Sequence, residues 1–391
     1  MRRKLSAQAL GFTILVGICL ALPVTVAGAQ VTGSVTLDAS APSVVYGSAV
    51  TFTGSVSPPF GGETVQLVDE AAGVILATTA TDASGAFALD VALEASSTVW
   101  ASSGGVESDP VAVEVRAKVS IRLGSVRLFD RAVARGSVAP AAAGTTVRVS
   151  LVLAGRVVAG RDVTVAPEGA YRATFPIRQP GMYRVRAASR PTGLARGTAA
   201  GGPEATPMPS LRAGSHGAFV RALERRLAAL HYRLVGIDAT YDVRTGDAVL
   251  AFRKVQGMSR TTTVDAAMWR RLADPRIPKP RSTAKAFHIE VDQSRQVLYT
   301  VDGGVVTNVI HVSTGANGAT HDGAFRVYRK LAGFSPNRLY YPSYFDGLRA
   351  IHGWTEVPAY PASHGCVRVP YWNAQWIFGL ATLGTRVIVH H

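Results

Sequence analysis

Two stretches of this sequence, about 82 residues apart, repeat each other. The matching segments are Gly54-Ser-Val-Ser-Pro-Pro with Gly136-Ser-Val-Ala-Pro-Ala, Gly62-Glu-Thr-Val-Gln-Leu with Gly144-Thr-Thr-Val-Arg-Val, and, at an offset of 84, Ser84-Gly-Ala-Phe with Glu168-Gly-Ala-Tyr. Self-similarity over this length indicates two copies of one small domain in tandem. The 391 residues leave room for further domains beyond this pair.

Within each copy, short runs rich in Val and Thr alternate apolar with polar residues, as in Ala49-Val-Thr-Phe-Thr-Gly. Clusters of Gly, Pro, Asp and Ser separate the runs, a pattern typical of an antiparallel β-sandwich. We therefore predict immunoglobulin-like modules over residues 30–116 and 117–190. Neither carries clustered catalytic residue types, so we interpret both as spacers, with a ligand-binding module as the alternative.

The next region changes from strand to helix periodicity. Residues 191–208 are rich in Gly, Ala, Pro and Thr, which predicts a linker. Residues 209–274 then predict a three-helix bundle, because apolar side chains recur at helical spacing and Asp265 is suited to cap the third helix. The apolar positions are Phe219, Val220, Leu223, Leu227 and Leu230, then Ala248, Val249, Phe252 and Val255, then Trp269 and Leu272.

A Pro-containing segment, 275–285, predicts a second linker before a β-rich domain over residues 286–391. Its strand-like runs are His288-Ile-Glu-Val, Gln296-Val-Leu-Tyr-Thr-Val, Val305-Val-Thr-Asn-Val-Ile-His-Val and Arg386-Val-Ile-Val-His. A helix is predicted from Pro370, a residue favoured at the first helical position, to about Leu380. The fold class predicted for the whole chain is multidomain and mainly β.

The N-terminus has the pattern of a secretory signal over residues 1–29, with a basic start, an apolar run and small residues before Gln30. The apolar run is shorter than the ~20 residues of a spanning helix, which disfavours the alternative of a membrane anchor. We expect a secreted protein of the periplasm or cell wall. Signal removal takes Cys19 with it, so Cys366 becomes the single cysteine of the exported chain. Such a cysteine pairs between molecules, reacts, or lies buried and inert.

Charge is unevenly distributed along the sequence. Residues 30–115 contain ten acidic and no basic residues, whereas residues 116–391 contain 38 basic and 16 acidic ones. A basic, exported segment suits an anionic wall or membrane surface, with a merely solvated basic surface as the alternative. Nucleic acid is a poor partner for a secreted chain without a recognisable nucleic-acid-binding motif.

Cys366 lies in a setting suited to nucleophilic catalysis. A thiol nucleophile needs a base and donors for the oxyanion. His352 lies 14 residues upstream of Cys366 and His364 two residues upstream. Gly365 lets backbone N–H groups turn inward, and a helix N-terminus near residue 370 would stabilise a thiolate if it pointed at the sulfur. Inert packing is one alternative. Zinc ligation by the two histidines and the cysteine is another, although the chain offers no Cys-x-x-Cys or His-Glu-x-x-His element.

The helical segment resembles the peptidoglycan-binding domain that accompanies many cell-wall enzymes. The matching residues are Gly214-x-x-Gly217, Val220-x-x-Leu223-x-x-x-Leu227, Tyr232, Gly236-Ile-Asp238, Thr245-x-x-Ala248-Val249-x-x-Phe252 and Trp269-x-x-Leu272. The family's acidic-Gly-x-Phe-Gly turn is replaced by Ala239-Thr-Tyr-Asp-Val. The resemblance implies wall binding, with a structural linker domain as the alternative.

Residues 286–391 resemble the L,D-transpeptidase (YkuD-type) catalytic domain. Its signature, an upstream His-Gly followed by Ser-His-Gly-Cys-x-Arg, is present as Ile351-His352-Gly353 and Ser363-His364-Gly365-Cys366-Val367-Arg368. Flanking agreement comes from Val312-Ser-Thr-Gly315, Thr320-x-x-Gly323-x-Phe325-x-Val327 and Gly384-Thr-Arg-Val-Ile. The proline that usually follows the threonine at position 320 is His321 here.

This resemblance implies a transferase acting on peptidoglycan. Cys366 attacks the diaminopimelate–D-alanine bond of a tetrapeptide donor stem and releases D-alanine, with His352 as the base. Backbone N–H groups of His364, Gly365 and Cys366 form the oxyanion hole, and an amine of a second, acceptor stem resolves the thioester into a cross-link. Two alternatives stay open: an L,D-carboxypeptidase that passes the acyl group to water, and a non-catalytic wall-binding protein.

The remaining candidate site residues concern substrate. His364 is expected to shape the motif or position substrate rather than act as the base. Arg368 is a candidate partner for a substrate carboxylate, with a structural salt bridge as the alternative. Ser363, Gly353 and Tyr341 complete the predicted substrate-binding set, and Tyr340 and Tyr344 belong to the same aromatic stretch as Tyr341. The resemblance implies no cofactor and no metal. The expected partner is peptidoglycan, with anionic wall polymers as a further candidate.

Overall fold

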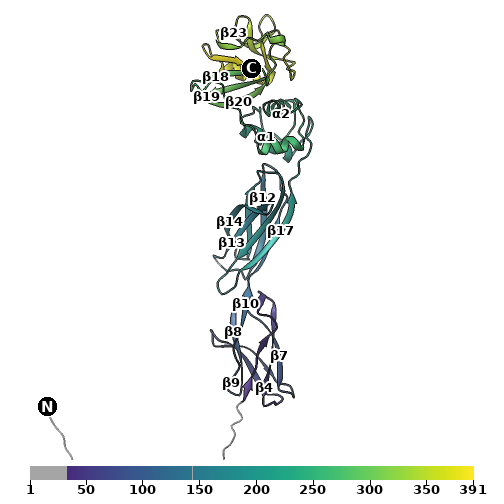
Figure 1. Ribbon diagram of the computed structural model, residues 1–391, viewed down its shortest axis with the longest axis vertical. Coiled ribbons are helices and arrows are strands. Elements are labelled where there is room, and N and C mark those ends of the chain that lie inside the picture. Colours follow the sequence, from purple (N-terminus) through teal and green to yellow (C-terminus); the bar gives the residue numbers. More distant parts are fainter. Residues whose placement is uncertain (1–32, 143) are drawn as a thin grey trace, which may run out of the picture. The chain divides into compact units, whose positions relative to one another are not determined.

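The computed structural model describes residues 33–142 and 144–391 (Figure 1). These residues are mainly β-structure, as predicted, with four α-helices among them. They divide into two compact units, one comprising the described residues up to 42 with 50–91 and 97–113, and one comprising 43–49, 92–96 and 114–391. The predicted signal segment and Cys19 lie outside the described residues. Among the described residues, no helix has the length and apolar character needed to cross a membrane.

Residues 33–116 form two small sheets. One has the strand order β1-β4-β2 with β7 also paired to β4, and the other has the order β3-β10-β8-β5-β6 with β9 also paired to β8. The strands are β1 (Ser34–Val35), β2 (Asp38–Ala39), β3 (Ser43–Val45), β4 (Ala49–Ser57), β5 (Thr64–Asp69), β6 (Val74–Ala80), β7 (Ala86–Ala92), β8 (Ser97–Ser103), β9 (Val106–Glu107) and β10 (Val111–Arg116). Along β4, Val50, Phe52 and Val56 are buried at alternating positions, which is the period of two that the sequence predicted.

The second repeat also forms two sheets, in the orders β11-β12-β15 and β14-β13-β16-β17. The strands are β11 (Lys118–Leu123), β12 (Arg131–Ala139), β13 (Thr146–Leu153), β14 (Arg156–Thr164), β15 (Ala170–Pro176), β16 (Met182–Ser189) and β17 (Gly197–Ala205). A Cβ atom on Gly136 would lie 2.5 Å from the Tyr171 hydroxyl, and one on Gly54 would lie 2.5 Å from the Phe87 ring. The same glycine–aromatic contact thus recurs in both copies, in agreement with the sequence repeat. The immunoglobulin-like topology and the spacer role stay predictions.

The prediction that residues 191–208 form a linker is wrong. Gly197–Ala205 form β17, which pairs antiparallel with β16. The strand escaped notice because it contains small residues instead of large apolar ones. A Cβ atom on Gly197 would lie 2.0 Å from the Ala117 carbonyl oxygen, and one on Gly201 would lie 2.8 Å from that of Ile121. Small residues are therefore what allow β17 to pass this close to the neighbouring backbone.

Three helices follow, as predicted: α1 (Ala218–Ala229), α2 (Val243–Val255) and α3 (Ala266–Ala273). The Asp265 carboxylate caps α3 by accepting a 2.7 Å hydrogen bond from the Met268 N–H. Asp242 caps α2 in the same way, accepting from the Thr245 N–H at 3.0 Å. Most of the predicted apolar positions are buried, among them Val220, Leu223, Leu227, Val249, Phe252, Trp269 and Leu272, whereas Phe219 is only partly buried.

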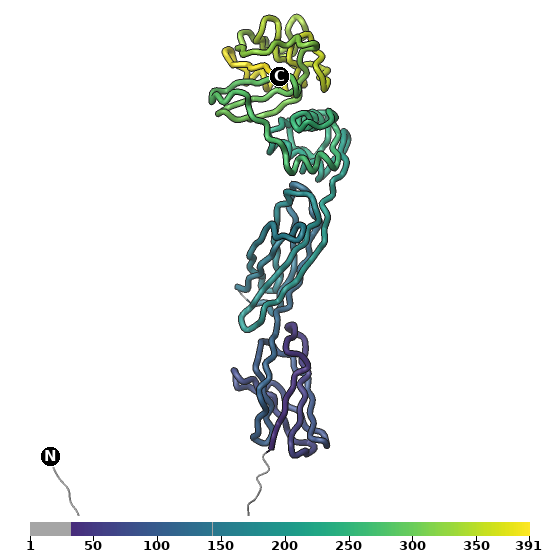
Figure 2. The backbone as a smooth tube through the Cα atoms, viewed as in Figure 1, coloured from purple at the N-terminus to yellow at the C-terminus, as the bar shows by residue number. Residues whose placement is uncertain are grey.

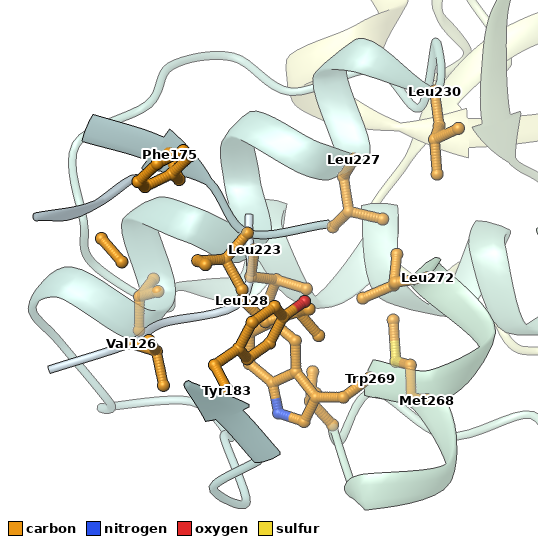
Figure 3. Packing of buried hydrophobic residues seen from close by; sticks show 14 of the residues in the cluster. Val126, Leu128, Phe175, Tyr183, Leu223, Leu227, Leu230, Met268, Trp269 and Leu272 are labelled. Atoms are coloured by element: carbon orange, nitrogen blue, oxygen red, sulfur yellow. The ribbon is translucent and has the colours of Figure 1, made fainter. Parts of the chain in front are cut away.

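One hydrophobic core joins the second sandwich, the helices and the first strands of the C-terminal region. Figure 3 shows its centre, where Leu128 and Tyr183 of the sandwich lie among the helical residues Leu223 and Trp269. At its other end the cluster includes Leu230 and Tyr232 together with Val297, Tyr299, Val301 and Val309. The helices therefore share buried surface with the domain on either side of them.

The C-terminal region contains two sheets and one helix. A five-stranded sheet has the order β20-β19-β18-β26-β21, and a four-stranded sheet has the order β22-β23-β24-β25. Their strands are β18 (His288–Asp292), β19 (Val297–Asp302), β20 (Val305–His311), β21 (Gly323–Arg326), β22 (Arg329–Lys330), β23 (Tyr340–Asp346), β24 (Arg349–Trp354), β25 (Val367–Pro370) and β26 (Arg386–His390), with the 3-10 turn η1 (Ala316–Gly318) and helix α4 (Tyr371–Leu380). The last strand, β26, runs parallel to β18, so the end of the chain returns to the strand that begins the domain (Figure 2).

A second core lies between these sheets and α4 and includes Ile289, Val291, Leu298, Phe345, Ile351, Val367, Val369 and Ile377. Ile351 on β24 and the two valines of β25 occupy alternate positions and face this core. The residues between them, including His352 and Arg368, therefore lie on the opposite face of the β24–β25 pair.

Candidate active site

The parallel pair β24–β25 brings the two predicted catalytic side chains together. His352 lies opposite Arg368, and Ile351 lies opposite Val367. Extending this register by one residue sets Cys366 opposite Ala350, on the face that also carries His352. With about 4.8 Å between strands and 3.3 Å of rise per residue, the Cα atoms of Cys366 and His352 are about 8 Å apart. Side chains at such a diagonal are within reach of each other, so the register puts the imidazole of β24 and the thiol at the start of β25 on one face.

The His352 ring is neutral, and one of its two nitrogens is hydrogen-bonded to the backbone. Its side chain is buried, and Nδ1 lies 2.9 Å from the carbonyl oxygen of Gly353. A carbonyl only accepts, so Nδ1 carries the proton and Nε2 keeps its lone pair. Burial lowers the pKa of His352 to about 4, with the nearby charge of Arg368 acting in the same direction. The Trp354 ring meets the imidazole edge to face at 5.6 Å and fixes its plane. The ring is thus prepared to accept a proton through Nε2.

Cys366 is partly buried and is a free thiol. Burial raises its pKa, and this effect is opposed by a backbone hydrogen bond from Ala350 and by the charges of Arg368 and Arg349. The sulfur lies 3.8 Å from the carbonyl oxygen of Leu348. At neutral pH the resting state is therefore a neutral thiol beside a neutral imidazole, so the chemistry requires a base.

The turn that precedes Cys366 is held by Ser363. Its hydroxyl donates to the Cys366 carbonyl oxygen at 2.5 Å and accepts from the Gly365 N–H at 3.0 Å. Gly365 has a φ of +129°, and a Cβ atom there would lie 2.9 Å from the Ala319 carbonyl oxygen. The Thr320 hydroxyl donates to the Gly365 carbonyl oxygen at 2.9 Å. Ser363 thus uses its hydroxyl inside the motif, and the glycine is required by both conformation and space.

Gly353 is placed by helix packing. A Cβ atom on Gly353 would lie 2.7 Å from the Ala374 side chain of α4 and 3.0 Å from the Tyr340 ring. A side chain here would push α4 away from β24 and disturb the carbonyl oxygen that accepts from His352. Gly353 therefore acts on the site through the backbone, by orienting the histidine.

The predicted role of the α4 N-terminus at the thiol is wrong. Pro370 is the N-cap of α4, and the extended strand β25 separates it from Cys366. Four residues of strand span about 13 Å. The field of a helix terminus acts within its first turn, so α4 packs under the site rather than pointing at the sulfur.

The other sequence-predicted residues have distinct surroundings. The Arg368 guanidinium carbon lies 5.3 Å from the centroid of the Trp354 ring, and among residues 33–142 and 144–391 it forms no ion pair, which removes the salt-bridge alternative. His364 is exposed. Tyr341 packs on Tyr340 and on Phe378, with ring centroids 4.7 and 5.1 Å apart, and has a φ of +50°. Tyr344 is buried.

Sequence reasoning missed a polar cluster beside the turn. Arg349 donates through Nε to the Ala319 carbonyl oxygen at 2.7 Å and through Nη2 to His321 Nε2 at 2.9 Å. Asp346 lies 3.2 Å from Arg349 and 3.0 Å from His321 Nδ1. Arg349 also lies against Gly365, where a Cβ atom would be 3.0 Å from Nε. The one available signal was the unusual His321, since nothing in the sequence marks Arg349.

No group of three or more His, Cys, Asp or Glu side chains in the described parts of the chain is arranged to hold a metal ion. The site consists of a thiol, an imidazole, a glycine turn and two neighbouring arginines. Such a set is suited to acyl transfer through a thioester.

Two segments in the C-terminal half of the chain match known families. Residues 286–389 match the YkuD family, the L,D-transpeptidase catalytic domain. Residues 216–272 match a family described as a peptidoglycan binding domain. No curated protein matches the chain.

Solved structures include similar proteins. The chain is 33% identical to an L,D-transpeptidase from Xylanimonas cellulosilytica, covering 48% of this chain and 100% of that one, with a TM-score of 0.45. It is 23% identical to the catalytic domain of an L,D-transpeptidase from E. faecium, covering 28% and 100% of the two chains, with a TM-score of 0.24. An L,D-transpeptidase from Mycobacterium tuberculosis is 12% identical over 69% of this chain and 95% of that one, with a TM-score of 0.26.

Proposed function

This chain belongs to the L,D-transpeptidase family, and from that premise we propose that Cys366 and His352 form the catalytic pair of a secreted enzyme that cross-links peptidoglycan. The observation that carries the proposal is the register of β24 and β25, which places both residues on one face. A neutral histidine with Nε2 free, next to a thiol with a raised pKa, is the arrangement that general-base activation needs.

In the acylation half, Nε2 of His352 takes the proton of the Cys366 thiol as the sulfur attacks. The target is the carbonyl carbon between diaminopimelate and D-alanine in a tetrapeptide stem. The C–N bond then breaks, the imidazolium gives its proton to the departing amine, and D-alanine leaves. The product is a thioester on Cys366, and His352 is again neutral.

In the second half, the side-chain amine of an acceptor stem attacks the thioester carbonyl. His352 removes a proton from that amine, an amide bond forms between the stems, and the sulfur leaves and recovers the proton. Because the resting pair is neutral, proton transfer accompanies bond formation in both halves instead of preceding it.

The oxyanion that develops during each attack needs fixed donors. Of the three N–H groups expected to serve, that of Gly365 already donates to Ser363. We therefore assign the oxyanion hole to the N–H groups of His364 and Cys366. Ser363 and Gly365 support them by holding the turn, and Gly353 supports the base by orienting His352.

Substrate binding is assigned to groups near this face. Arg368 has no ion-pair partner in the described residues, and its fork of donors suits a stem carboxylate. Tyr341, packed beside α4, is the aromatic candidate. His364, exposed in the motif, is suited to contact substrate rather than to act as the base.

The rest of the chain fits a wall-anchored role. Peptidoglycan is the partner indicated by both matched domains, which points to a location outside the cytoplasm. We propose that residues 1–29 direct secretion, that the helical domain over residues 209–274 binds the wall, and that the two N-terminal modules act as spacers. The excess of basic residues from 116 onward favours contact with anionic wall polymers.

Turnover of a defined muropeptide tests the proposal. The purified chain and its Cys366→Ser variant are incubated with disaccharide-tetrapeptide, and the products are identified by mass spectrometry. We expect cysteine-dependent cross-linked dimers with loss of D-alanine. Tripeptide without dimer would assign the L,D-carboxypeptidase reaction instead. Equal product from the serine variant would reject Cys366 as the nucleophile, and no product from either protein would reject the proposed reaction.

A further inference from the structure

The connection between the two catalytic strands has no regular structure. Because β24 and β25 are parallel, the chain has to cross over between them. Residues 355–362, here called the crossover segment, contain neither helix nor strand and join Trp354 to Ser363. The segment therefore begins three residues after His352 and ends where the cysteine motif starts. It is the stretch of chain that joins the proposed base to the thiol.

Side chains from outside the segment hold its backbone. The residues of the segment are exposed or half-buried, and three of its carbonyl groups accept hydrogen bonds from side chains elsewhere in the chain. Nε2 of His311 donates to the Val357 carbonyl oxygen at 2.7 Å, and the Ser313 hydroxyl donates to that of Tyr360 at 2.7 Å. Between them, Arg260 donates to the Ala359 carbonyl oxygen at 2.8 Å and, through its other terminal nitrogen, to that of Ser294 at 2.8 Å. Arg260 belongs to the helical domain, not to the catalytic domain.

A second helical-domain residue fixes His311. Lys254 on α2 is buried, and its Nζ lies 2.6 Å from His311 Nδ1 and donates to the carbonyl oxygens of Gln296 at 2.9 Å and Val312 at 3.2 Å. Since Nε2 of His311 donates to Val357, Nδ1 has to accept from Lys254. Burial lowers the pKa of His311 to about 3, which keeps the ring neutral. Burial also lowers the pKa of Lys254, to about 6. Its three acceptors nevertheless require three N–H groups, and only the ammonium form supplies three.

The same lysine connects to the cysteine motif by another route. The side chain of Gln296 accepts from the Thr314 N–H at 2.8 Å and donates to the Thr314 hydroxyl at 2.6 Å. The Thr314 carbonyl oxygen in turn accepts from the Ser363 N–H at 3.0 Å. Ser363 then holds the turn at Cys366. Both ends of the crossover segment are thus tied to residues that the helical domain supports.

We infer that the helical domain is a working part of the active site: Lys254 and Arg260 are positioning residues that hold the crossover segment so that Cys366 meets His352. The inference rests on the catalytic pair proposed above. It gives the domain that matches a peptidoglycan-binding family a second task, which is to keep the two halves of the catalytic pair in register.

Simple docking of the two domains does not need these contacts. Tyr232 and Leu230 already share a hydrophobic core with β19 and β20, and the N–H of Val309 donates to the His231 carbonyl oxygen at 2.8 Å. Burying a lysine ammonium is costly, so apolar residues would join the domains more simply. Arg260 is exposed, so its removal leaves the shared core intact and separates positioning from folding.

The test compares three variants of the full chain. Arg260→Gln removes the two donors, Arg260→Lys keeps the charge without the fork, and Arg270→Gln removes a matched exposed charge on α3. For each we measure kcat and KM for release of D-alanine from disaccharide-tetrapeptide, the rate of Cys366 alkylation by iodoacetamide from neutral to high pH, and Tm. Lys254→Met, which removes the buried ammonium, serves as a second disruption of the same contacts.

We expect Arg260→Gln to lower kcat about tenfold or more with KM and Tm nearly unchanged, because a small displacement of a reacting group is costly. Alkylation should slow about tenfold at neutral pH, where His352 has to take the proton, and converge with wild type at high pH, where the thiolate forms unaided. Arg260→Lys should recover part of the loss, Arg270→Gln should match wild type, and Lys254→Met should lower kcat at least as far as Arg260→Gln.

Equal kcat and equal alkylation profiles for Arg260→Gln and Arg270→Gln would overturn the inference. So would a loss of kcat that comes with a matching fall in Tm, or with slower alkylation at every pH. If wild type releases no D-alanine, the proposed function fails, and the alkylation profiles alone decide whether the helical domain positions the thiol.

Discussion

Two histidines of the catalytic domain, His311 and His352, are buried to almost the same degree, with 1% and 2% of their surface exposed. Burial lowers the pKa of both, to about 3 and about 4, so both are neutral. They differ in their second nitrogen. His311 uses both nitrogens, one with Lys254 and one with Val357. His352 commits only Nδ1, to Gly353, and within the described residues the structure gives Nε2 no hydrogen-bond partner.

The comparison shows that burial and a shifted pKa do not by themselves mark a catalytic histidine. A ring whose two nitrogens are both bonded has no lone pair or proton left for chemistry. A ring with one nitrogen fixed and the other without a hydrogen bond is oriented and still able to react. We infer the role of each histidine from its hydrogen-bond partners. Replacing each histidine in turn tests that role.

The largest expected effect follows from His352→Gln. Glutamine keeps a donor near Gly353 but supplies no base, so we expect kcat for D-alanine release to fall about 10³-fold, within the range for loss of a general base. The free energy of unfolding at neutral pH should change by less than about 1 kcal/mol, since no buried partner is left unpaired. Single-turnover acylation followed by mass spectrometry measures the first quantity, and denaturant unfolding measures the second. Wild-type acylation by this variant would mean that another group takes the thiol proton.

The comparison is sharpened next by disturbing the thiol for which His352 is the proposed base. Gly365→Ala places a Cβ atom against the Ala319 carbonyl oxygen at a φ of +129°, so the turn has to shift. A displacement of about 1 Å at the sulfur should cost about 100-fold in kcat. Gly379→Ala on α4 is the matched control, because a Cβ atom there meets nothing within 4 Å. The control should retain activity; equal losses in both variants would show that the effect is not specific to the turn.

The sequence predicted most of the fold because its signals were local. The repeat at Gly54 and Gly136, the cap at Asp265 and the apolar spacing of the three helices each depend on residues close together in the chain. The strand Gly197–Ala205 was missed because its small residues are explained by a neighbour about 80 residues away, Ala117, which no local pattern reveals.

The residues of the candidate site also divide into those marked by local sequence signals and those brought in by distant segments. Motif spacing predicted Cys366, His352 and the turn glycine, since these residues are close in sequence. Arg349 escaped because its partners, Ala319 and His321, come from a different segment. Lys254 and Arg260 escaped for the stronger reason that they lie in another domain, where a basic side chain looks like ordinary solvated surface. Contacts between distant segments are set by tertiary packing, and one sequence carries little trace of them.

A smaller effect, measured on stability, is expected at the other histidine. His311→Ala leaves the Lys254 ammonium short of an acceptor and the Val357 carbonyl without its donor. Leaving buried groups unpaired should lower the free energy of unfolding by about 2–3 kcal/mol. Denaturant unfolding measures this loss. His352→Gln is the control, so the comparison fails if that variant is destabilised as much as His311→Ala.

The last effect is a difference in how stability depends on pH. The folded-state pKa of His352 is about 4, below the ordinary value of 6.5. Above pH 6.5 the ring is neutral in both states and contributes nothing. Between pH 6.5 and 4 only the unfolded chain binds the proton, so folding becomes less favourable as pH falls. His352→Gln lacks this titrating imidazole, so its free energy of unfolding should decline less steeply with falling pH than that of wild type. The two slopes should differ by about 1.4 kcal/mol per pH unit in the middle of that range.

Denaturant unfolding at several pH values between 7.5 and 4.5 measures the slopes, with His364→Gln as the control because that histidine is exposed in the same motif. The difference between wild type and His352→Gln should vanish above pH 7, whereas the control should follow wild type throughout. Parallel curves for all three proteins would mean that His352 titrates normally in the folded state. In that case the imidazole is open to water, and the buried, oriented base on which the comparison with His311 depends does not exist.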